Sequence, residues 1–401
     1  MNPWRGLKNI PRNIWLLAFT TLINRSGTMV LPYLVLYMTE KIRVSPAEAG
    51  LVLAFYGAGG LITAPFVGKL SDRIGALRIM KFSLIATGIM LFMFSFVTNY
   101  YLILFITLVW SVINESFRPA NLSFISKEVL PEQRKTSFAL NRLAINLGMS
   151  IGPVVGGFLA ALNFSFLFYV DGITSLIAGI FLILSHIKPE KETKATEEKL
   201  DEPESDSSIK HHSIFRDKKF LIYMLALVPV EMVFFQHIGA LPLYLVRDLK
   251  FVESTFGMLM AINTVIIIFI EVPLNNFMSR WDDRKLIAVG ALLCGLGYGL
   301  MVFSSSILLI IFTVVVWTFG EMIFFPSSAS YIAEISPEAK RGEYMGYFQM
   351  TFSFSMMLGP WLGTIVLDNF GANVLWIGAF IFGGFSTGVF LKHGNKSSKT
   401  H

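Results

Sequence analysis

Long apolar runs alternate with short polar turns along almost the whole chain. A bilayer core of about 30 Å requires about 20 apolar residues in each helix that crosses it. Runs of this length lie at residues 14–38, 47–67, 79–98, 100–125, 137–161 and 164–186 and, after a polar interruption, at 219–246, 254–277, 286–304, 307–332, 342–367 and 373–392. The pattern predicts an all-helical integral membrane protein with twelve transmembrane helices.

The composition supports this fold class and excludes several others. Hydrophobic residues make up 54% of the chain and charged residues 15%, whereas roughly a quarter of the residues in a soluble domain are charged. The single cysteine, Cys294, excludes an internal disulfide framework and a cysteine-based zinc cluster. The net charge of +6 comes from basic residues in short loops, which is typical of membrane topology and not of nucleic-acid binding. We therefore expect the lipid bilayer as a partner and no nucleic acid.

The distribution of basic residues predicts the orientation of the chain. An even number of spans places both termini on one side of the membrane. Of the 33 Lys and Arg residues, those assigned to loops on the other side are Lys41, Arg43, Arg247 and Lys250. Because cytoplasmic loops collect Lys and Arg, we expect a multi-pass inner-membrane protein with both termini in the cytoplasm.

One long polar segment divides the chain. Residues 188–218 are rich in Lys, Glu, Asp and Ser and lack apolar periodicity, which predicts a flexible cytoplasmic linker. It separates a first six-helix bundle, residues 1–187, from a second, residues 219–401. The linker also contains His211 and His212, but an isolated pair in a linker is usually solvated, and we expect no metal site.

The two bundles repeat one another at an offset of about 207 residues. At this offset 117–120 (Phe-Arg-Pro-Ala) corresponds to 325–328 (Phe-Pro-Ser-Ser), and Gly152-Pro153 corresponds to Gly359-Pro360. Six-helix repeats joined by a cytoplasmic linker are a transporter architecture, with the substrate path at the interface between the halves. The repeat therefore predicts two pseudo-symmetric bundles around a central site.

A charged segment rich in glycine follows the second run. It reads Gly68-Lys69-Leu70-Ser71-Asp72-Arg73-Ile74-Gly75-Ala76-Leu77-Arg78. This segment resembles the signature loop of the major facilitator superfamily, between its second and third helices. The glycines of the segment, Gly68 and Gly75, permit a tight reversal between helices. The resemblance implies that Asp72 latches the halves together and that Asp72, Arg73 and Arg78 have a gating role. The alternative is that these charges only enforce topology. The second-half counterpart, 276–285, keeps basic residues but has lost the pattern.

Glycines also form a stripe in the fifth run. Gly148, Gly152, Pro153, Gly156 and Gly157 allow close approach of another helix, and the proline bends the span. The motif resembles one that drug-exporting antiporters of the superfamily carry in their fifth helix. It marks either export by antiport or ordinary helix packing. The second half keeps a weaker version with Ser355, Gly359-Pro360 and Gly363.

The resemblance covers essentially the whole chain and is nearest to the twelve-span drug:proton antiporter branch, the bacterial multidrug-resistance proteins. That branch usually carries an Arg early in the fourth helix that is implicated in proton transfer. Here the corresponding stretch, 109–113 (Val-Trp-Ser-Val-Ile), has no Arg. The resemblance therefore does not supply the proton-coupling residue.

Charged residues inside the runs are the main site candidates, because a charge at the centre of a membrane helix costs about 2.5–3.5 kcal/mol on insertion scales. The resemblance implies that the first, fourth, seventh and tenth helices line a central cavity. Each of these runs carries a charge: Arg25 beside Asn24, Glu115 with Arg118, Glu231 with His237 nearby, and Glu321. The agreement between the two sets predicts that these residues form the substrate and coupling site.

Glu231 is the predicted proton carrier, with Glu115 as runner-up and Arg25 as its basic partner. Glu231 lies about twelve residues into its run with no basic residue within one helical turn. The alternatives are a permanent Arg25–Glu231 pair that holds the halves together and a Glu115–Arg118 pair on one helical face. His237 could titrate near neutrality or simply bind a backbone carbonyl.

Three further charges lie on less central runs. Glu271 precedes Pro273, whose missing N–H releases a carbonyl, and we expect a structural polar contact there. Arg142 lies near the start of its run and is expected to reach the cytoplasmic interface. Asp171, in the sixth run, is not assigned a role.

Three function hypotheses remain at this point. The first is a proton-driven exporter of amphipathic drug-like compounds, and the second is a transporter of one metabolite such as a siderophore, sugar or amino acid. The mixed charge of the predicted cavity suits an anionic or zwitterionic metabolite. The third, a membrane enzyme or receptor, is disfavoured because no nucleophile–base set, metal motif or Walker loop appears. We expect a monomer with no cofactor, a small-molecule substrate and protons as the coupling ion.

Overall fold

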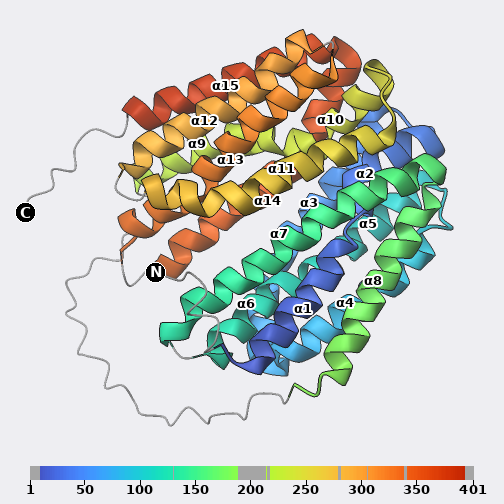
Figure 1. Cartoon of the computed structure of the whole chain (residues 1–401), viewed down its shortest axis with the longest axis vertical. Helices are drawn as coiled ribbons and strands as arrows, with labels where there is room; N and C mark the ends of the chain where they lie inside the picture. The colour runs from blue at the N-terminus through green and yellow to red at the C-terminus, as the bar shows by residue number, and fades with distance from the viewer. Residues whose placement is uncertain are drawn as a thin grey trace, which may run out of the picture.

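A computed structural model describes residues 10–129, 131–187, 214, 217–278, 281–304, 306–337 and 341–392. Within these ranges every regular element is helical (Figure 1). The candidates His211 and His212 lie outside the described residues, as does most of the predicted linker, so the boundary between the halves remains a prediction.

The first half contains eight α-helices. They are α1 (Arg12–Ser26), α2 (Val30–Leu36), continued by a π-helical turn η2 (Tyr37–Lys41), α3 (Pro46–Ile74), α4 (Ala76–Phe94), α5 (Tyr100–Glu115), α6 (Phe117–Glu128), α7 (Pro131–Leu162) and α8 (Ser165–Leu184). Because α1, α2 and η2 form one crossing, as do α5 and α6, these elements correspond to six spans.

The second half repeats this order. It contains α9 (Lys218–Phe234), the 3-10 turn η4 (Phe235–His237), α10 (Ala240–Leu243), the π-helical turn η5 (Tyr244–Asp248), α11 (Glu253–Met278), α12 (Asp283–Gly299) with the 3-10 turn η6 (Leu300–Phe303), α13 (Ile307–Ile335), α14 (Arg341–Phe370) and α15 (Ala372–Lys392). The internal repeat extends to the backbone conformation. Each π-helical turn is followed, two residues after its end, by a basic residue with a positive φ, Arg43 (φ 66°) after η2 and Lys250 (φ 60°) after η5.

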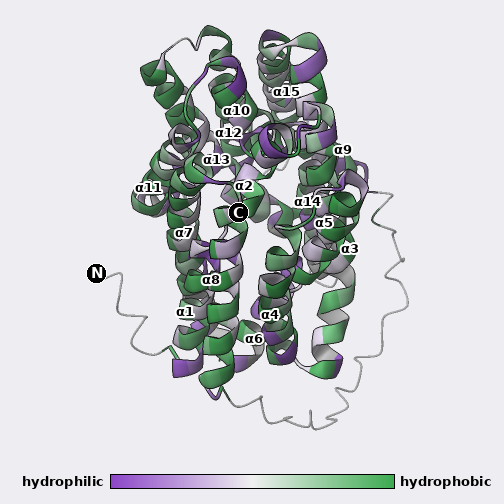
Figure 2. Ribbon diagram, turned by 90° about the vertical axis from the view of Figure 1, so that its right-hand side faces the viewer, coloured by the Kyte–Doolittle hydropathy of each residue, from purple (hydrophilic) through white to green (hydrophobic). Residues whose placement is uncertain are grey.

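The chain is a multi-span, all-helical membrane protein, as predicted. Among the described residues, eleven segments are long and apolar enough to cross a membrane. The remaining predicted span, 47–67, lies within α3, whose 29 residues extend about 44 Å. Apolar residues dominate most turns of the helices (Figure 2).

Two helix boundaries differ from the prediction because helices continue beyond their apolar parts. α3 runs on to Ile74, so Gly68 lies inside a helix and not in a reversal. The turn is made at Gly75, whose φ of 91° suits glycine and disfavours other residues. Likewise α7 begins at Pro131 and not near residue 137, which places Arg142 eleven residues into the helix.

The two halves join at one end of the molecule. We call the end where α1 begins and α15 ends the terminus end, and the other the far end. At the far end a single apolar cluster includes residues of both halves, among them Tyr33, Val52, Leu104, Leu241, Phe256 and Trp376. Towards the terminus end each half has its own cluster, one around Ile14 and Leu84, the other around Phe220 and Ile287. Among the described residues, the halves therefore share an apolar core at the far end alone, the end at which their helices meet in Figure 1.

Helices α3 and α14 show how the halves separate. A Cβ atom on Gly57 of α3 would lie 2.6 Å from the Cα of Met357 of α14, so the two backbones touch there. Gly50, two turns nearer the far end, meets Thr364 and Trp361 in the same register. At Gly346 of α14, about three turns further towards the terminus end, an added Cβ would meet no atom within 4 Å. The helices diverge towards the terminus end.

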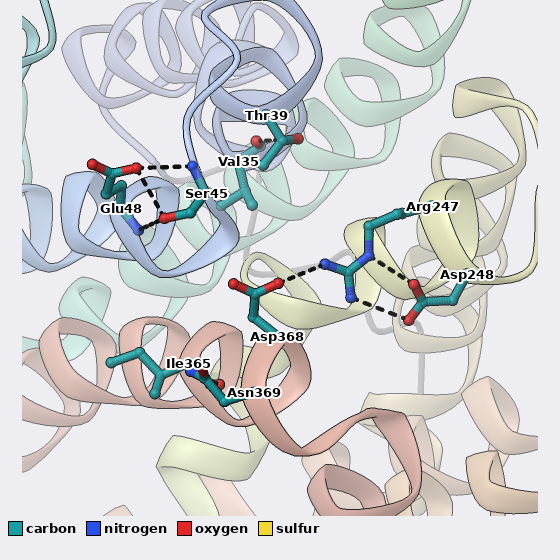
Figure 3. A network of polar contacts seen from close by, with 9 residues as sticks. All are labelled: Val35, Thr39, Ser45, Glu48, Arg247, Asp248, Ile365, Asp368 and Asn369. Carbon is teal, nitrogen blue, oxygen red and sulfur yellow. Dashed lines mark hydrogen bonds and ion pairs between the residues drawn. The ribbon is translucent and has the colours of Figure 1, made fainter.

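Polar contacts fix the far end (Figure 3). Ser45 and Glu48 form a reciprocal capping box that starts α3. Arg247 of η5 binds Asp248 at 2.7 Å and Asp368 of α14 at 3.2 Å. The capping box pairs backbone N–H groups at the start of α3, and the Arg247–Asp368 ion pair joins η5 to α14.

Candidate functional site

The four predicted cavity charges all lie at the middle of their crossings. Arg25 is central in the crossing 12–41, Glu115 in 100–128, Glu231 in 218–248 and Glu321 in 307–335. Their common depth follows from the positions of the helices and agrees with the prediction. The structure does not bring all four together, however, and divides them among three polar clusters.

The first cluster belongs to the N-terminal half. The hydroxyl of Tyr56 donates to Glu115 Oε1 at 2.8 Å and accepts from Asn114 Nδ2 at 2.7 Å. Among the described side chains, Glu115 and Arg118 form no ion pair, which disfavours the alternative in which these two residues simply pair with each other. Arg118 is exposed, and the Nε of Arg25 is buried without a hydrogen-bond partner. Among the described residues, the Arg25 guanidinium is thus left with an unused donor at mid-depth.

Asn24 does not face this cluster. It is 5% exposed, and its Nδ2 donates to Ser175 Oγ of α8 at 3.3 Å. Consecutive residues on a helix point about 100° apart, so the neighbour of Arg25 packs inside the half instead of lining the path. The prediction of Asn24 as a cavity residue is therefore not supported by the geometry.

The second cluster surrounds Glu231 and lies within the C-terminal half. Its carboxylate is fully buried and accepts hydrogen bonds from Thr351 Oγ1 at 3.1 Å and Ser355 Oγ at 3.0 Å, both on α14. Within the described part of the chain it contacts no cation, so Arg25 is not its partner and the Arg25–Glu231 pair is wrong. The side chain turns towards α14 of its own half and not across the interface.

The internal repeat gives Arg25 and Glu231 nearly equivalent places. A Cβ on Gly148 of α7 would lie 2.5 Å from the Cβ of Arg25, so α7 packs closely on α1 there. At the repeat offset α14 carries Ser355, which instead binds Glu231. The first half therefore leaves its central charge unpartnered on the α7 side, whereas the second half supplies a hydroxyl.

Of the two predictions for His237, titration near neutrality or a contact with a backbone carbonyl, the structure shows the carbonyl contact. Its Nδ1 lies 2.7 Å from the carbonyl oxygen of Phe234, and its ring stacks on Trp317 with centroids 6.3 Å apart. Phe234 also contacts the imidazole, at 4.6 Å between centroids. The histidine is held in an aromatic cluster by a backbone carbonyl.

The third cluster lies between the halves. Asn263 Nδ2 of α11 donates to Thr318 Oγ1 at 2.9 Å and to Glu321 Oε2 at 3.1 Å. Arg142 of α7 forms an ion pair with Glu271 of α11. The prediction was that Arg142 extends to the cytoplasmic interface of the membrane. Instead, because α7 starts earlier than predicted, Arg142 lies opposite Glu271. The expected polar contact of Glu271 is confirmed.

Asp171 has a structural role that its position in the sequence did not reveal. The first crossing is interrupted between α1 and α2, which leaves backbone N–H groups without helical partners. The N–H groups of Met29 and Val30 both donate to Asp171 Oδ2 at 3.1 Å. The carboxylate on α8 thus stabilises the break in the first crossing.

The glycine motif packs α7 against the first crossing and against α11. A Cβ on Gly152 would lie 2.6 Å from the Thr28 carbonyl oxygen, and one on Gly156 would lie 3.0 Å from the Tyr33 ring. Gly157 faces the other half, since a Cβ added to it would lie 2.9 Å from Ser254 Cα. The Tyr33 hydroxyl donates a hydrogen bond to the Pro153 carbonyl at 2.6 Å. The packing interpretation is confirmed, whereas the antiport interpretation stays a prediction.

Sequence reasoning missed the polar partners of these charges. Tyr56, Asn263 and Thr351 lie in apolar runs where a single hydroxyl or amide is common, and their partners are more than 50 residues away. Of these partners, only Ser355 stood out in the sequence, because it occupies in the second-half motif the position that Gly148 has in the first half. Such contacts depend on helix packing and have no local pattern.

The predicted gate is only partly described. Arg73 and Arg78 are exposed on either side of the Gly75 turn, whereas the side chain of Asp72 lies outside the described residues. In the second-half counterpart, Asp282 binds Arg284 at 2.7 Å, and this hydrogen bond holds the pKa of Asp282 below its usual range. An acid in that turn thus already has a local partner.

Two substitutions test the gate. Asp72→Ala is expected to leave the protein folded and membrane-inserted but to slow transport severalfold, because it removes a gate charge and not a cavity residue. Asp282→Ala is the matched control and should transport normally. Initial rates in proteoliposomes of equal protein content measure both. Equal rates for Asp72→Ala and the parent protein would mean that the segment serves topology alone.

Two groups of membrane-spanning helices, joined at one end and carrying charges at mid-depth, define a transporter of small molecules. The chain belongs to the Major Facilitator Superfamily, whose family model matches residues 14–251 and 232–392. This is a family of transporters and not of enzymes.

Several relatives extend over nearly the whole chain. The Na(+), Li(+), K(+)/H(+) antiporter of Planococcus maritimus is 25% identical over 401 residues, covering 90% of this chain and 92% of that protein. Quinolone resistance protein NorA of Staphylococcus aureus is 24% identical over 364 residues, covering 89% and 90%. The crystal structure of the nucleoside transporter NupG has a TM-score of 0.78 at 17% identity, covering 96% of this chain and 100% of that chain. The last similarity concerns the fold alone.

Proposed function

We propose that this protein is a proton-coupled exporter of amphipathic small molecules, working by alternating access in the bacterial inner (cytoplasmic) membrane. The observation that carries the proposal is Glu231, a carboxylate that is 0% exposed at the middle of its crossing. Only two hydroxyl groups, those of Thr351 and Ser355, bind it among the described residues. Glu231 is the proposed proton carrier, and Glu115 is the second candidate.

The chemistry of this environment supports proton transfer. A carboxylate charge at the centre of a membrane helix costs about 2.5–3.5 kcal/mol on insertion scales, and here no cation offsets that cost. Uptake of a proton removes the charge, so the protonated, neutral form of Glu231 tolerates burial better than the charged form. A hydroxyl can donate to the charged form and accept from the neutral form, so Thr351 and Ser355 serve both. A movement of α9 relative to α14 would shift the balance between them.

The arrangement of the halves supports alternating access. They share an apolar core at the far end, whereas α3 and α14 diverge towards the terminus end. With both termini in the cytoplasm, as the basic loops indicate, this conformation faces the cytoplasm. Rocking of one half against the other would then expose the central site to the outside. Two relatives, an antiporter of cations and protons and a quinolone resistance protein, support antiport and drug export.

A second candidate function rests on the first polar cluster. The Nε of Arg25 is buried without a hydrogen-bond partner, and Arg118 is exposed nearby at similar depth. Two guanidinium groups, one of them with a donor unused among the described residues, suit the carboxylate or phosphate of an anionic or zwitterionic metabolite. Such a substrate would make the protein a dedicated metabolite transporter.

One experiment decides between these functions. Purified protein is first screened for thermal stabilisation by a panel of lipophilic cations, neutral aromatic compounds and anionic metabolites, since a bound ligand raises the free energy of unfolding by mass action. Binders are then followed in proteoliposomes with an imposed pH gradient. The proposal expects uphill movement of amphipathic compounds that stops when the gradient is collapsed. Uphill movement of one anionic metabolite alone would favour the second function, and no dependence on the gradient would refute proton coupling.

A further inference from the structure

A cavity of about 70 Å³ lies at the interface of the halves, where α7, α11 and α13 meet. Each helix contributes one face, and the lining residues are Arg142, Asn146, Ile267, Glu271, Glu321, Met322 and Phe325. It lies on the terminus side of mid-depth, away from the hydroxyl-bound carboxylate of Glu231. The proposed proton transfer at Glu231 does not involve this cavity.

The charges of this cavity do not cancel. Arg142 forms an ion pair with Glu271, so these two side chains together contribute no net charge. Glu321 is partly exposed, and its one hydrogen-bond donor among the described residues is the neutral amide of Asn263. When Glu321 is ionised, the cavity therefore carries one unbalanced negative charge in a region of low dielectric constant.

Apart from the amide of Asn146 on α7, the remaining wall is apolar and aromatic. Ile267 lies one turn from Glu271 on α11, and Met322 and Phe325 lie beside Glu321 on α13. Phe325 continues into an aromatic cluster, with ring centroids 5.0 Å from Phe234 and 5.8 Å from Phe352. An aromatic ring attracts a cation through its quadrupole, and a methionine thioether adapts to irregular shapes.

We propose that this cavity binds the ammonium group of amphipathic organic cations, with Glu321 as counterion and the Phe325–Phe234–Phe352 cluster as the surface for the apolar part. A volume of about 70 Å³ holds a small head group and not a whole drug-sized molecule, so the rest of such a ligand lies along the aromatic cluster. The inference rests on the proposed function and adds its substrate class. An anion would meet an unbalanced charge of its own sign here.

The test uses the full-length purified protein and one small cation. Binding of radiolabelled benzyltrimethylammonium is measured by equilibrium dialysis, with benzylsulfonate as an anion of similar size. Wild type is expected to bind the cation and not the anion. Glu321→Gln should weaken cation binding at least about tenfold, and Phe325→Leu about two- to fivefold, the loss of one cation–π contact. Glu334→Gln, which changes an exposed acid on the same helix, is the matched control and should bind like wild type.

Further variants keep the outcome interpretable. Glu321→Asp retains the charge and should keep most of the affinity, which separates loss of charge from loss of folding if Glu321→Gln is unstable. The site is refuted if wild type does not bind benzyltrimethylammonium, if Glu321→Gln binds it unchanged, or if benzylsulfonate binds better. Unchanged proton-driven export with no Glu321-dependent binding would therefore reject this substrate class and leave the proposed function standing.

Discussion

Glu231→Gln is expected to abolish proton-driven accumulation of substrate while leaving substrate binding within about twofold of wild type. Glutamine preserves the shape of the side chain and can hydrogen-bond to the Thr351 and Ser355 hydroxyls, but it cannot take up or release a proton. The variant therefore loses the free energy by which proton binding is coupled to transport. The accumulation ratio across proteoliposomes should fall to one.

The measurement compares uptake under an imposed pH gradient with exchange in its absence. Exchange should persist in Glu231→Gln, because a neutral residue still permits the halves to rock. Glu334→Gln is the control, since it removes an acid that is exposed, whereas Glu231 is buried. If Glu231→Gln still accumulates substrate with unchanged pH dependence, the carrier lies elsewhere, and Glu115→Gln, which removes the carboxylate bound by Tyr56, is the variant to compare.

Cross-linking the halves at the terminus end is the second change expected to have a complete effect. Continuing the register of α3 on α14 from the contact between Gly57 and Met357 brings position 68 opposite Gly346, where an added Cβ would meet no atom within 4 Å. Cysteines at these two positions, in a Cys294→Ala background, should form a disulfide only when the terminus end closes. Because the disulfide fixes that closed conformation, transport should stop, and a reducing agent should restore it.

The two single-cysteine variants are the matched controls and should transport at the same rate before and after oxidation. Gel mobility after cleavage between the halves quantifies the cross-linked fraction, and initial rates quantify transport. Undiminished flux in fully cross-linked protein would contradict alternating access. Faster cross-linking in the presence of substrate would further indicate that substrate binding favours closure of the terminus end.

Much of the fold could be predicted from the sequence because the membrane acts on the chain locally. The thickness of the bilayer sets the length of each apolar run, so eleven of the predicted spans recur as segments able to cross a membrane and the other lies within α3. Helix ends were less predictable. At α3 and α7 the helix continues into polar sequence, since backbone hydrogen bonding does not stop where the apolar core ends.

The site was predictable in depth but not in contacts. Counting along a helix places Glu231 and Arg25 at mid-membrane, since each residue adds a fixed 1.5 Å to the rise. Counting does not tell which way the side chains turn. Glu231 turns to Thr351 and Ser355, more than 100 residues away in sequence, and leaves Arg25 unpaired. The Arg142–Glu271 pair likewise depends on how two halves meet.

The sequence by itself thus determined the membrane class, the spans, the internal repeat and the depth of each charge, because these follow from hydrophobicity and helical rise along one dimension. The tertiary structure alone decided the partners: hydroxyls for Glu231, a tyrosine for Glu115, an amide for Glu321 and backbone N–H groups for Asp171. The physical reason is that a charge inside a membrane must find a polar group on a neighbouring helix. Which helix is the neighbour is set by glycine contacts and packing between distant segments, and local sequence does not specify it.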